Sequence, residues 1–204
     1  MPESLERERR ELELLLLKAQ RRIVNFAELH GWKDLTRESF FDRAEIYGSK
    51  ETFDRALAKI AGASEQIKFP KTYSAALENR VLMAVSPALY SENYSEGIEE
   101  DSYEKLLAHE IAHRLHIRIL KGNEDAMGPV WFFEGFAIYA AGQFSQDKSP
   151  LESAEIQSII SASARTSYRR YGILFRYLTR KAPIEELIEH ARKADFKLWL
   201  QEII

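Results

Sequence analysis

Apolar residues recur at the helical period along the first part of the chain. Leu12, Leu16, Ala19 and Ile23 lie three or four residues apart, which places them on one face of a helix. Gly31 is a typical helix stop. We expect one long amphipathic helix within residues 1–31, packed on the domain with its charged face in water. A propeptide or a partner-binding arm would have the same pattern.

Residues 40–100 predict strands with one helix between them. Residues 40–47 mix aromatic, aliphatic and charged side chains and predict a strand, and Phe53, Leu57 and Ile60 predict an amphipathic helix after it. The run Val81–Val85 is the clearest strand, and residues 73–77 before it predict either the other arm of a hairpin or a short helix. Residues 87–100 are polar and predict a loop beside a cleft.

The second half of the chain predicts helices. Asp101 and Glu104 fit a capping box that starts a helix close to Ser102, and Gly122 ends it. A second apolar segment ends at Gly142, and the sequence from Ser149 to Glu152 fits another capping box with Pro150 at the first helical position. Residues 164–181 carry six basic side chains and no acidic one, which indicates either a solvated helix face or a lining of the cleft. Pro183 and Phe196 begin two further short helices.

Composition excludes several classes of protein. The chain has 204 residues, of which 45% are hydrophobic and 30% charged, so it is long enough for one substantial core. The net charge of −3 gives no basic surface for nucleic acid, and the apolar runs are too short for a membrane span. The absence of cysteine leaves His, Glu and Asp as metal ligands. The acidic, interrupted N-terminus does not resemble a signal peptide, so we expect a cytoplasmic protein without nucleic-acid or membrane partners.

The motif H-E-x-x-H stands at residues 109–113, inside the helix predicted from Ser102. His109 and His113 lie one turn apart, about 40° from each other around the helix, so both imidazoles can reach one metal ion. Glu110 lies beside the same face, where a carboxylate can take a proton from a metal-bound water. This is the zincin signature, and it predicts a zinc-dependent hydrolase.

A third metal ligand is available in the apolar segment after it. Glu134 has apolar neighbours on its own helix face, such as Trp131 and Ile138. A carboxylate there is costly to bury without a partner, and a metal ion removes that cost. Gly135 has no side chain, so we expect it to let this helix approach the helix of the H-E-x-x-H motif closely.

The two motifs together, H-E-x-x-H followed by P-x-W-x-x-E-G-x-A-x-Y, resemble the gluzincin metallopeptidases. The resemblance is to the peptidase MA-like group, which is related to aminopeptidase N and thermolysin-like enzymes, and it covers residues 102–178. It implies that His109, His113 and Glu134 bind one zinc ion and that Glu110 is the general base. It also implies that the strand before the active helix is the edge strand on which an extended substrate lies.

The resemblance implies a catalytic tyrosine as well. In the family a Tyr stands nine residues before a Y-L pair, and Tyr168 has that spacing from Tyr177. Its hydroxyl would donate to the oxyanion of the transition state, with Tyr171 as the alternative. His116 falls near the ligand face, and we interpret it either as a substrate or ligand contact or as a surface histidine.

The sequence therefore predicts an α+β protein with a minimal gluzincin fold. A small mixed sheet would lie over the active helix, beside a mainly helical C-terminal lobe. We expect a single domain over residues 1–204, with an N-terminal helix (1–31), an upper lobe with the edge strand and active helix (32–122) and a helical lower lobe (123–204).

The predicted activity is zinc-dependent hydrolysis of peptide bonds in a peptide or protein, by a small endopeptidase. Members of the aminopeptidase N group carry a G-x-M-E-N element whose Glu holds the free amino terminus of the substrate. Here Met83 is followed by Ala84, Val85 and Ser86, which disfavours an aminopeptidase. A metal-stabilised interaction module without catalytic activity is the remaining alternative. The sequence gives no oligomeric state.

Overall fold

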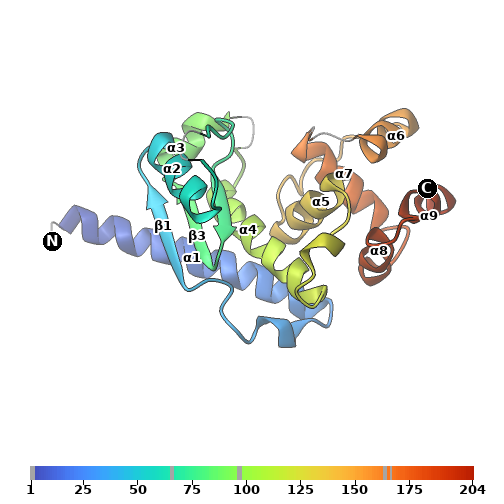
Figure 1. Ribbon diagram of the computed structural model, residues 1–204, viewed down its shortest axis with the longest axis horizontal. Coiled ribbons are helices and arrows are strands. Elements are labelled where there is room, and N and C mark those ends of the chain that lie inside the picture. The colour runs from blue at the N-terminus through green and yellow to red at the C-terminus, as the bar shows by residue number, and fades with distance from the viewer. Residues whose placement is uncertain (1–2, 65–66, 96–97, 163–164, 166) are drawn as a thin grey trace.

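A small mixed sheet and a larger helical body form the protein (Figure 1). The computed structural model describes residues 3–64, 67–95, 98–162, 165 and 167–204. The helices are α1 (Glu3–Leu29), α2 (Lys50–Ile60), α3 (Pro87–Asn93), α4 (Ser102–Ile119), α5 (Val130–Ala141), α6 (Ser153–Ser161), α7 (Tyr168–Leu178), α8 (Ile184–Ala191) and α9 (Phe196–Ile203). The strands are β1 (Arg43–Tyr47), β2 (Ala75–Glu78) and β3 (Val81–Val85). The predicted α+β class is confirmed by this mixture of helices and a small sheet.

None of the described helices has the length and apolar character needed to cross a membrane.

The central strand of the sheet is β3. The strand order is β1-β3-β2, with β1 parallel and β2 antiparallel to β3. Every residue of Val81–Val85 is at most 2% exposed, because packed elements cover both faces of a central strand. This burial explains the continuous apolar run, and the strand order shows that β3 is not the edge strand that the family resemblance implied. The strand with an open edge beside the active helix is β2.

A tight hairpin joins β2 to β3, as one of the two alternatives for residues 73–77 predicted. Asn79 and Arg80 both have positive φ, 47° and 62°, which is the geometry of a two-residue hairpin turn. Val85 N donates to Ser74 O over 2.9 Å, which fixes the register. The backbone groups of Ser74 and of every second residue after it point to β3. Those of Ala75 and Leu77, which lie between, therefore point to the open edge.

The loop predicted for residues 87–100 contains a helix instead. The Ser86 side chain accepts from Leu89 N over 3.4 Å, and Pro87 is the first residue of α3. A serine followed by proline is a common start of a helix, and the polar composition of the segment concealed it.

Both predicted capping boxes are wrong, although α4 begins at Ser102 as expected. Asp101 has φ 57° and makes no side-chain cap bond. Glu104 accepts hydrogen bonds from Arg22 of α1, at 2.6 and 2.9 Å, so it joins two helices instead of capping one. In α6 the residue before the helix is Glu152, which leaves Pro150 outside it.

Two glycines let α5 and α7 approach each other closely. A Cβ atom at Gly135 would lie 3.0 Å from Tyr171 O, and one at Gly172 would lie 2.4 Å from Ile138 Cγ2. The expectation that Gly135 permits contact with the H-E-x-x-H helix is therefore wrong, because Gly135 faces α7. The close packing matters for the site, because α5 carries Glu134 and α7 begins at Tyr168.

Candidate metal centre

Helix α4 presents His109 and His113 to the same point. Their Nε2 atoms are 3.0 Å apart, and the ring centroids are separated by 4.6 Å. The spacing of four residues places them one turn apart on one helix face, as the motif predicted.

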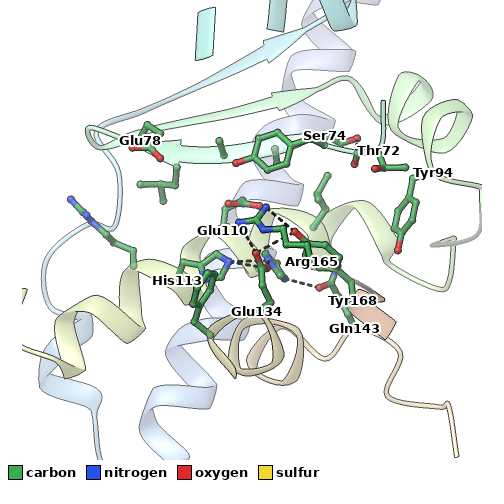
Figure 2. A pocket seen from close by; sticks show the side chains of 18 of the residues that line it. Thr72, Ser74, Glu78, Tyr94, Glu110, His113, Glu134, Gln143, Arg165 and Tyr168 are labelled. Atoms are coloured by element: carbon green, nitrogen blue, oxygen red, sulfur yellow. Dashed lines mark hydrogen bonds and ion pairs between the residues drawn. The ribbon is translucent and has the colours of Figure 1, made fainter. Parts of the chain in front are cut away.

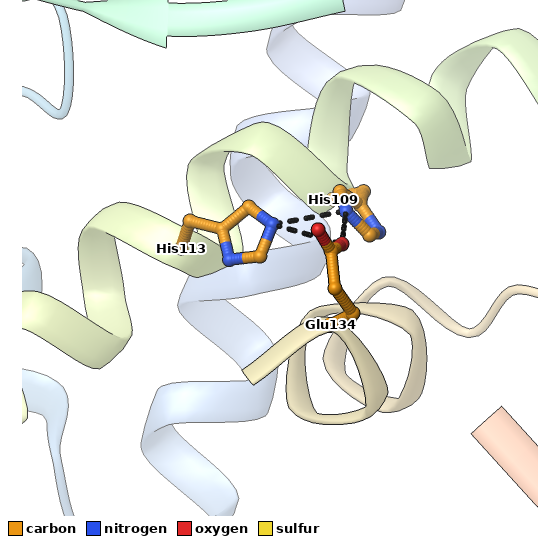
Figure 3. Close-up of side chains that lie close together, drawn as sticks. All are labelled: His109, His113 and Glu134. Atoms are coloured by element: carbon orange, nitrogen blue, oxygen red, sulfur yellow. Dashed lines mark hydrogen bonds and ion pairs between the residues drawn. The ribbon is translucent and has the colours of Figure 1, made fainter. Parts of the chain in front are cut away.

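Helix α5 brings Glu134 to the same point (Figure 3). Its Oε2 atom lies 3.1 Å from His109 Nε2 and 3.5 Å from His113 Nε2. Ligand atoms of the three residues all lie within 4.8 Å of one another, and Glu134 is only 3% exposed. Two imidazoles and a buried carboxylate in this arrangement could hold a metal ion.

Gln143 determines which nitrogen of His109 faces this point. His109 Nδ1 donates to Gln143 Oε1 over 2.9 Å, which leaves the lone pair of Nε2 directed at Glu134 Oε2. Two acceptor atoms at 3.1 Å repel each other unless a proton or a cation lies between them. The residues therefore fit a cation, and the bond from Gln143 is the kind of contact that orients histidine ligands in metal sites.

No sequence pattern indicates the role of Gln143. The residue follows Gly142, whose φ of 72° ends α5, and Gln143 N donates to Ile138 O over 3.0 Å. The direction of its side chain depends on this turn, and helical spacing cannot predict it.

The second oxygen of Glu134, Oε1, has different partners. Tyr168 Oη donates to Glu134 Oε1 over 3.2 Å, and Arg165 Nη2 lies 3.3 Å from the same oxygen (Figure 2). The carboxylate thus turns Oε2 to the histidines and Oε1 to a hydroxyl and a guanidinium. Burial raises the pKa of Glu134, but the imidazoles of His109 and His113 beside Oε2 outweigh it and hold that pKa well below its usual range.

Glu110 lies in the same cleft without being one of the three clustered ligands. It is half-buried and lines the cavity. In the absence of a cation, burial raises its pKa to about 8, and the neighbouring carboxylates add to the effect. A cation bound at His109, His113 and Glu134 would lower this pKa again, because a nearby opposite charge favours the carboxylate.

The cleft has a volume of about 460 Å³ and lies between β2 and α4. Residues from Thr72 to Glu78 line one wall, and Leu106, Glu110 and Ile117 of α4 line another. Tyr94 and Thr72 lie toward one end and Glu78 toward the opposite end (Figure 2).

Glu78 is a second residue that the sequence analysis overlooked. Residues 75–79 read A-A-L-E-N, which matches the G-x-M-E-N element at its last two positions. The pattern is informative only once β2, and not β3, is known to be the strand with the open edge.

His116 and Tyr171 lie outside the cleft. His116 is fully buried, and its ring stacks on Phe136 with a centroid distance of 4.4 Å. It is therefore neither a surface histidine nor a contact in the cleft. Tyr171 is 1% exposed in the core, whereas Tyr168 lines the cleft. The Tyr168 hydroxyl lies at the candidate metal centre, on Glu134 Oε1.

Comparison of the chain with protein-family models, with curated proteins and with solved structures found no match.

Proposed function

We propose that the protein is a zinc-dependent peptidase of gluzincin type. The observation that carries the proposal is the convergence of His109, His113 and Glu134 beside Glu110, in a cleft whose wall is an open strand edge. Zinc suits this ligand set because it favours tetrahedral sites with histidine and carboxylate ligands and leaves one position for water. When bound, zinc lowers the pKa of its water and polarises a carbonyl group.

The residues of the chain supply the remaining chemistry. The Glu110 carboxylate takes a proton as the water oxygen adds to the scissile carbonyl carbon, and the electron pair of the C=O bond moves to the oxygen. Tyr168 donates a hydrogen bond to that oxygen. The proton held by Glu110 passes to the amide nitrogen, the C–N bond breaks, and a carboxylic acid and an amine result.

An extended peptide fits the open edge of β2. The outward backbone groups of Ala75 and Leu77 can pair with a peptide chain, and alternate side chains of that chain would then enter the cleft. This geometry supports a peptide substrate over a small polar molecule.

Glu78 favours an aminopeptidase as the second candidate. Ala84 and Val85, which follow Met83 and disfavour an aminopeptidase in the sequence pattern, belong to the buried central strand. Glu78 stands on the edge strand and lines the cleft, so its carboxylate is available to a free amino group. Comparing peptides with free and acetylated amino termini separates the two candidates, since Glu78→Gln should abolish only a preference for the free amine.

The test of the proposal measures metal content and turnover together. Protein reconstituted with zinc should hold about one equivalent and cleave peptides from a mixture. Glu110→Gln should keep the zinc and lose turnover by about 10²- to 10⁴-fold. Zinc binding without cleavage of any peptide would instead support the metal-stabilised interaction module, and the absence of zinc binding would refute the proposed centre.

A further inference from the structure

The basic residues of positions 164–181 have different surroundings. Arg169 pairs with Asp147 at 2.5 Å, Arg170 pairs with Glu155, and Arg176 donates to the carbonyl oxygens of Gln143 and Phe144. Among these arginines, Arg165 has its guanidinium at the candidate metal centre. One part of the basic segment thus lines the cleft, while other parts form ion pairs and backbone contacts.

Three contacts join the side chains of Arg165, Tyr168 and Glu134, each to the other two. Arg165 Nη1 donates to Tyr168 Oη over 3.2 Å, Tyr168 Oη donates to Glu134 Oε1 over 3.2 Å, and Arg165 Nη2 lies 3.3 Å from the same carboxylate oxygen. The Arg165 side chain is 50% exposed and reaches across the cleft above Glu134 (Figure 2).

A hydroxyl that accepts a hydrogen bond from a cation becomes a stronger donor. The guanidinium draws electron density from the phenol oxygen, which polarises the O–H bond, and hydrogen bonds in such a chain strengthen one another. In the proposed peptidase the Tyr168 O–H turns from Glu134 Oε1 to the scissile carbonyl oxygen when the substrate binds, while Oη still accepts from Arg165 Nη1. The strength of this donor matters most when the carbonyl oxygen carries a full negative charge.

We propose that Arg165 is a positioning residue that holds and polarises the Tyr168 hydroxyl, so that it stabilises the negative charge on the carbonyl oxygen. The proposal rests on the proposed peptidase function. It makes Arg165 act on the step in which the water oxygen adds to the carbonyl carbon, because only then does the carbonyl oxygen gain the electron pair.

The test is a double-mutant cycle in zinc-loaded protein. Arg165→Met should lower kcat about 10- to 100-fold and change KM by less than about threefold, because the effect belongs to the transition state. In a Tyr168→Phe background the same substitution should change kcat by less than about twofold, since the hydroxyl through which it acts is absent. Arg165→Lys, which keeps a cationic donor, should recover part of the loss.

A binding measurement gives a readout that does not depend on turnover. A phosphinic peptide carries a charged tetrahedral group in place of the scissile bond, and its affinity should fall in Arg165→Met by about the same factor as kcat. Arg169→Met is the matched control: Arg169 lies one residue beyond Tyr168 and pairs with Asp147, so this variant should keep kcat and phosphinic-peptide affinity.

The outcomes separate this inference from the proposed function. If wild-type protein and Arg165→Met cleave peptides equally well, the role of Arg165 is refuted while the peptidase proposal stands. The same holds if the double mutant loses kcat by the product of the two single-mutant factors, because Arg165 would then act independently of Tyr168. A change in KM alone would also refute it. If wild-type protein with bound zinc cleaves no peptide, the proposed function fails, and this inference fails with it.

Discussion

Some residues of the candidate site can be identified from their spacing in the sequence, whereas others reach the site only because of how the chain folds. His109 and His113 follow from a four-residue interval, and Glu134 follows from the cost of a carboxylate on an apolar helix face. Gln143 and Arg165 lie in segments next to helices, where no periodic pattern exists, so the sequence could not assign their contacts.

The role of Gln143 can be tested by removing its acceptor while keeping its shape. Gln143→Met should weaken zinc binding about 10- to 100-fold, because His109 loses the bond that directs Nε2 to the metal. Gln143→Glu keeps an acceptor for His109 Nδ1 and should bind zinc at least as tightly as wild type. Competition with a chelator measures both affinities. Equal weakening in the two variants would show that only the shape of Gln143 matters.

The buried His116 should make the free energy of unfolding depend on pH, independently of catalysis. Burial lowers its pKa to about 3, from 6.5 in the unfolded chain, so the unfolded chain binds the extra proton between these values. The contribution to stability is therefore complete above pH 6.5 and is lost as the pH falls toward 3, by about 5 kcal/mol.

His116→Phe tests this dependence, because it keeps the ring contact with Phe136 and removes the proton site. Both ring nitrogens of His116 lack a hydrogen-bond partner in the described part of the chain, so at pH 7 the variant should be more stable by about 1 kcal/mol. Denaturant unfolding at pH 7, 5 and 4 should show this advantage growing as the pH falls. A constant difference across the series would contradict the assigned pKa.

At the scale of elements, the sequence predicted whether a segment forms a helix or a strand better than it predicted which elements lie beside it. The apolar run of β3 identified a strand, but the same run is expected for any strand covered on both faces, so the position of β3 in the sheet required the structure. The polar segment 87–93 formed a helix because its cap, Ser86, and its first residue, Pro87, favoured one.

The open edge of β2 gives a prediction for substrate binding. Leu77→Pro removes a backbone N–H that points to the open edge and leaves the bonds to β3 in place, so stability should change little beyond the loss of the leucine side chain. KM for an extended peptide should rise about tenfold, because one main-chain bond to the substrate is lost. Leu77→Ala is the control for the side chain. Equal KM values in the two variants would argue against pairing of the substrate with β2.

At the scale of the whole molecule, the metal centre joins parts of the chain that the fold brings together. Its ligands come from α4 and α5, while Tyr168 and Arg165 come from the start of α7 and the segment before it. One cluster of buried side chains extends from α1 to α9.

Zinc should therefore stabilise the whole fold and not only the site. A metal ion that binds the folded chain alone adds about 2.7 kcal/mol at a free concentration 100 times its Kd, which for a chain of this length raises Tm by about 5 to 10 °C. Removal of zinc with a chelator should reverse this rise, and adding zinc back should restore it. Glu134→Gln should lose most of the zinc-dependent rise, whereas Glu110→Gln should keep it, because Glu110 is not one of the three clustered ligands. A wild-type Tm that does not respond to zinc would contradict a metal site built from two helices of the core, whatever the protein hydrolyses.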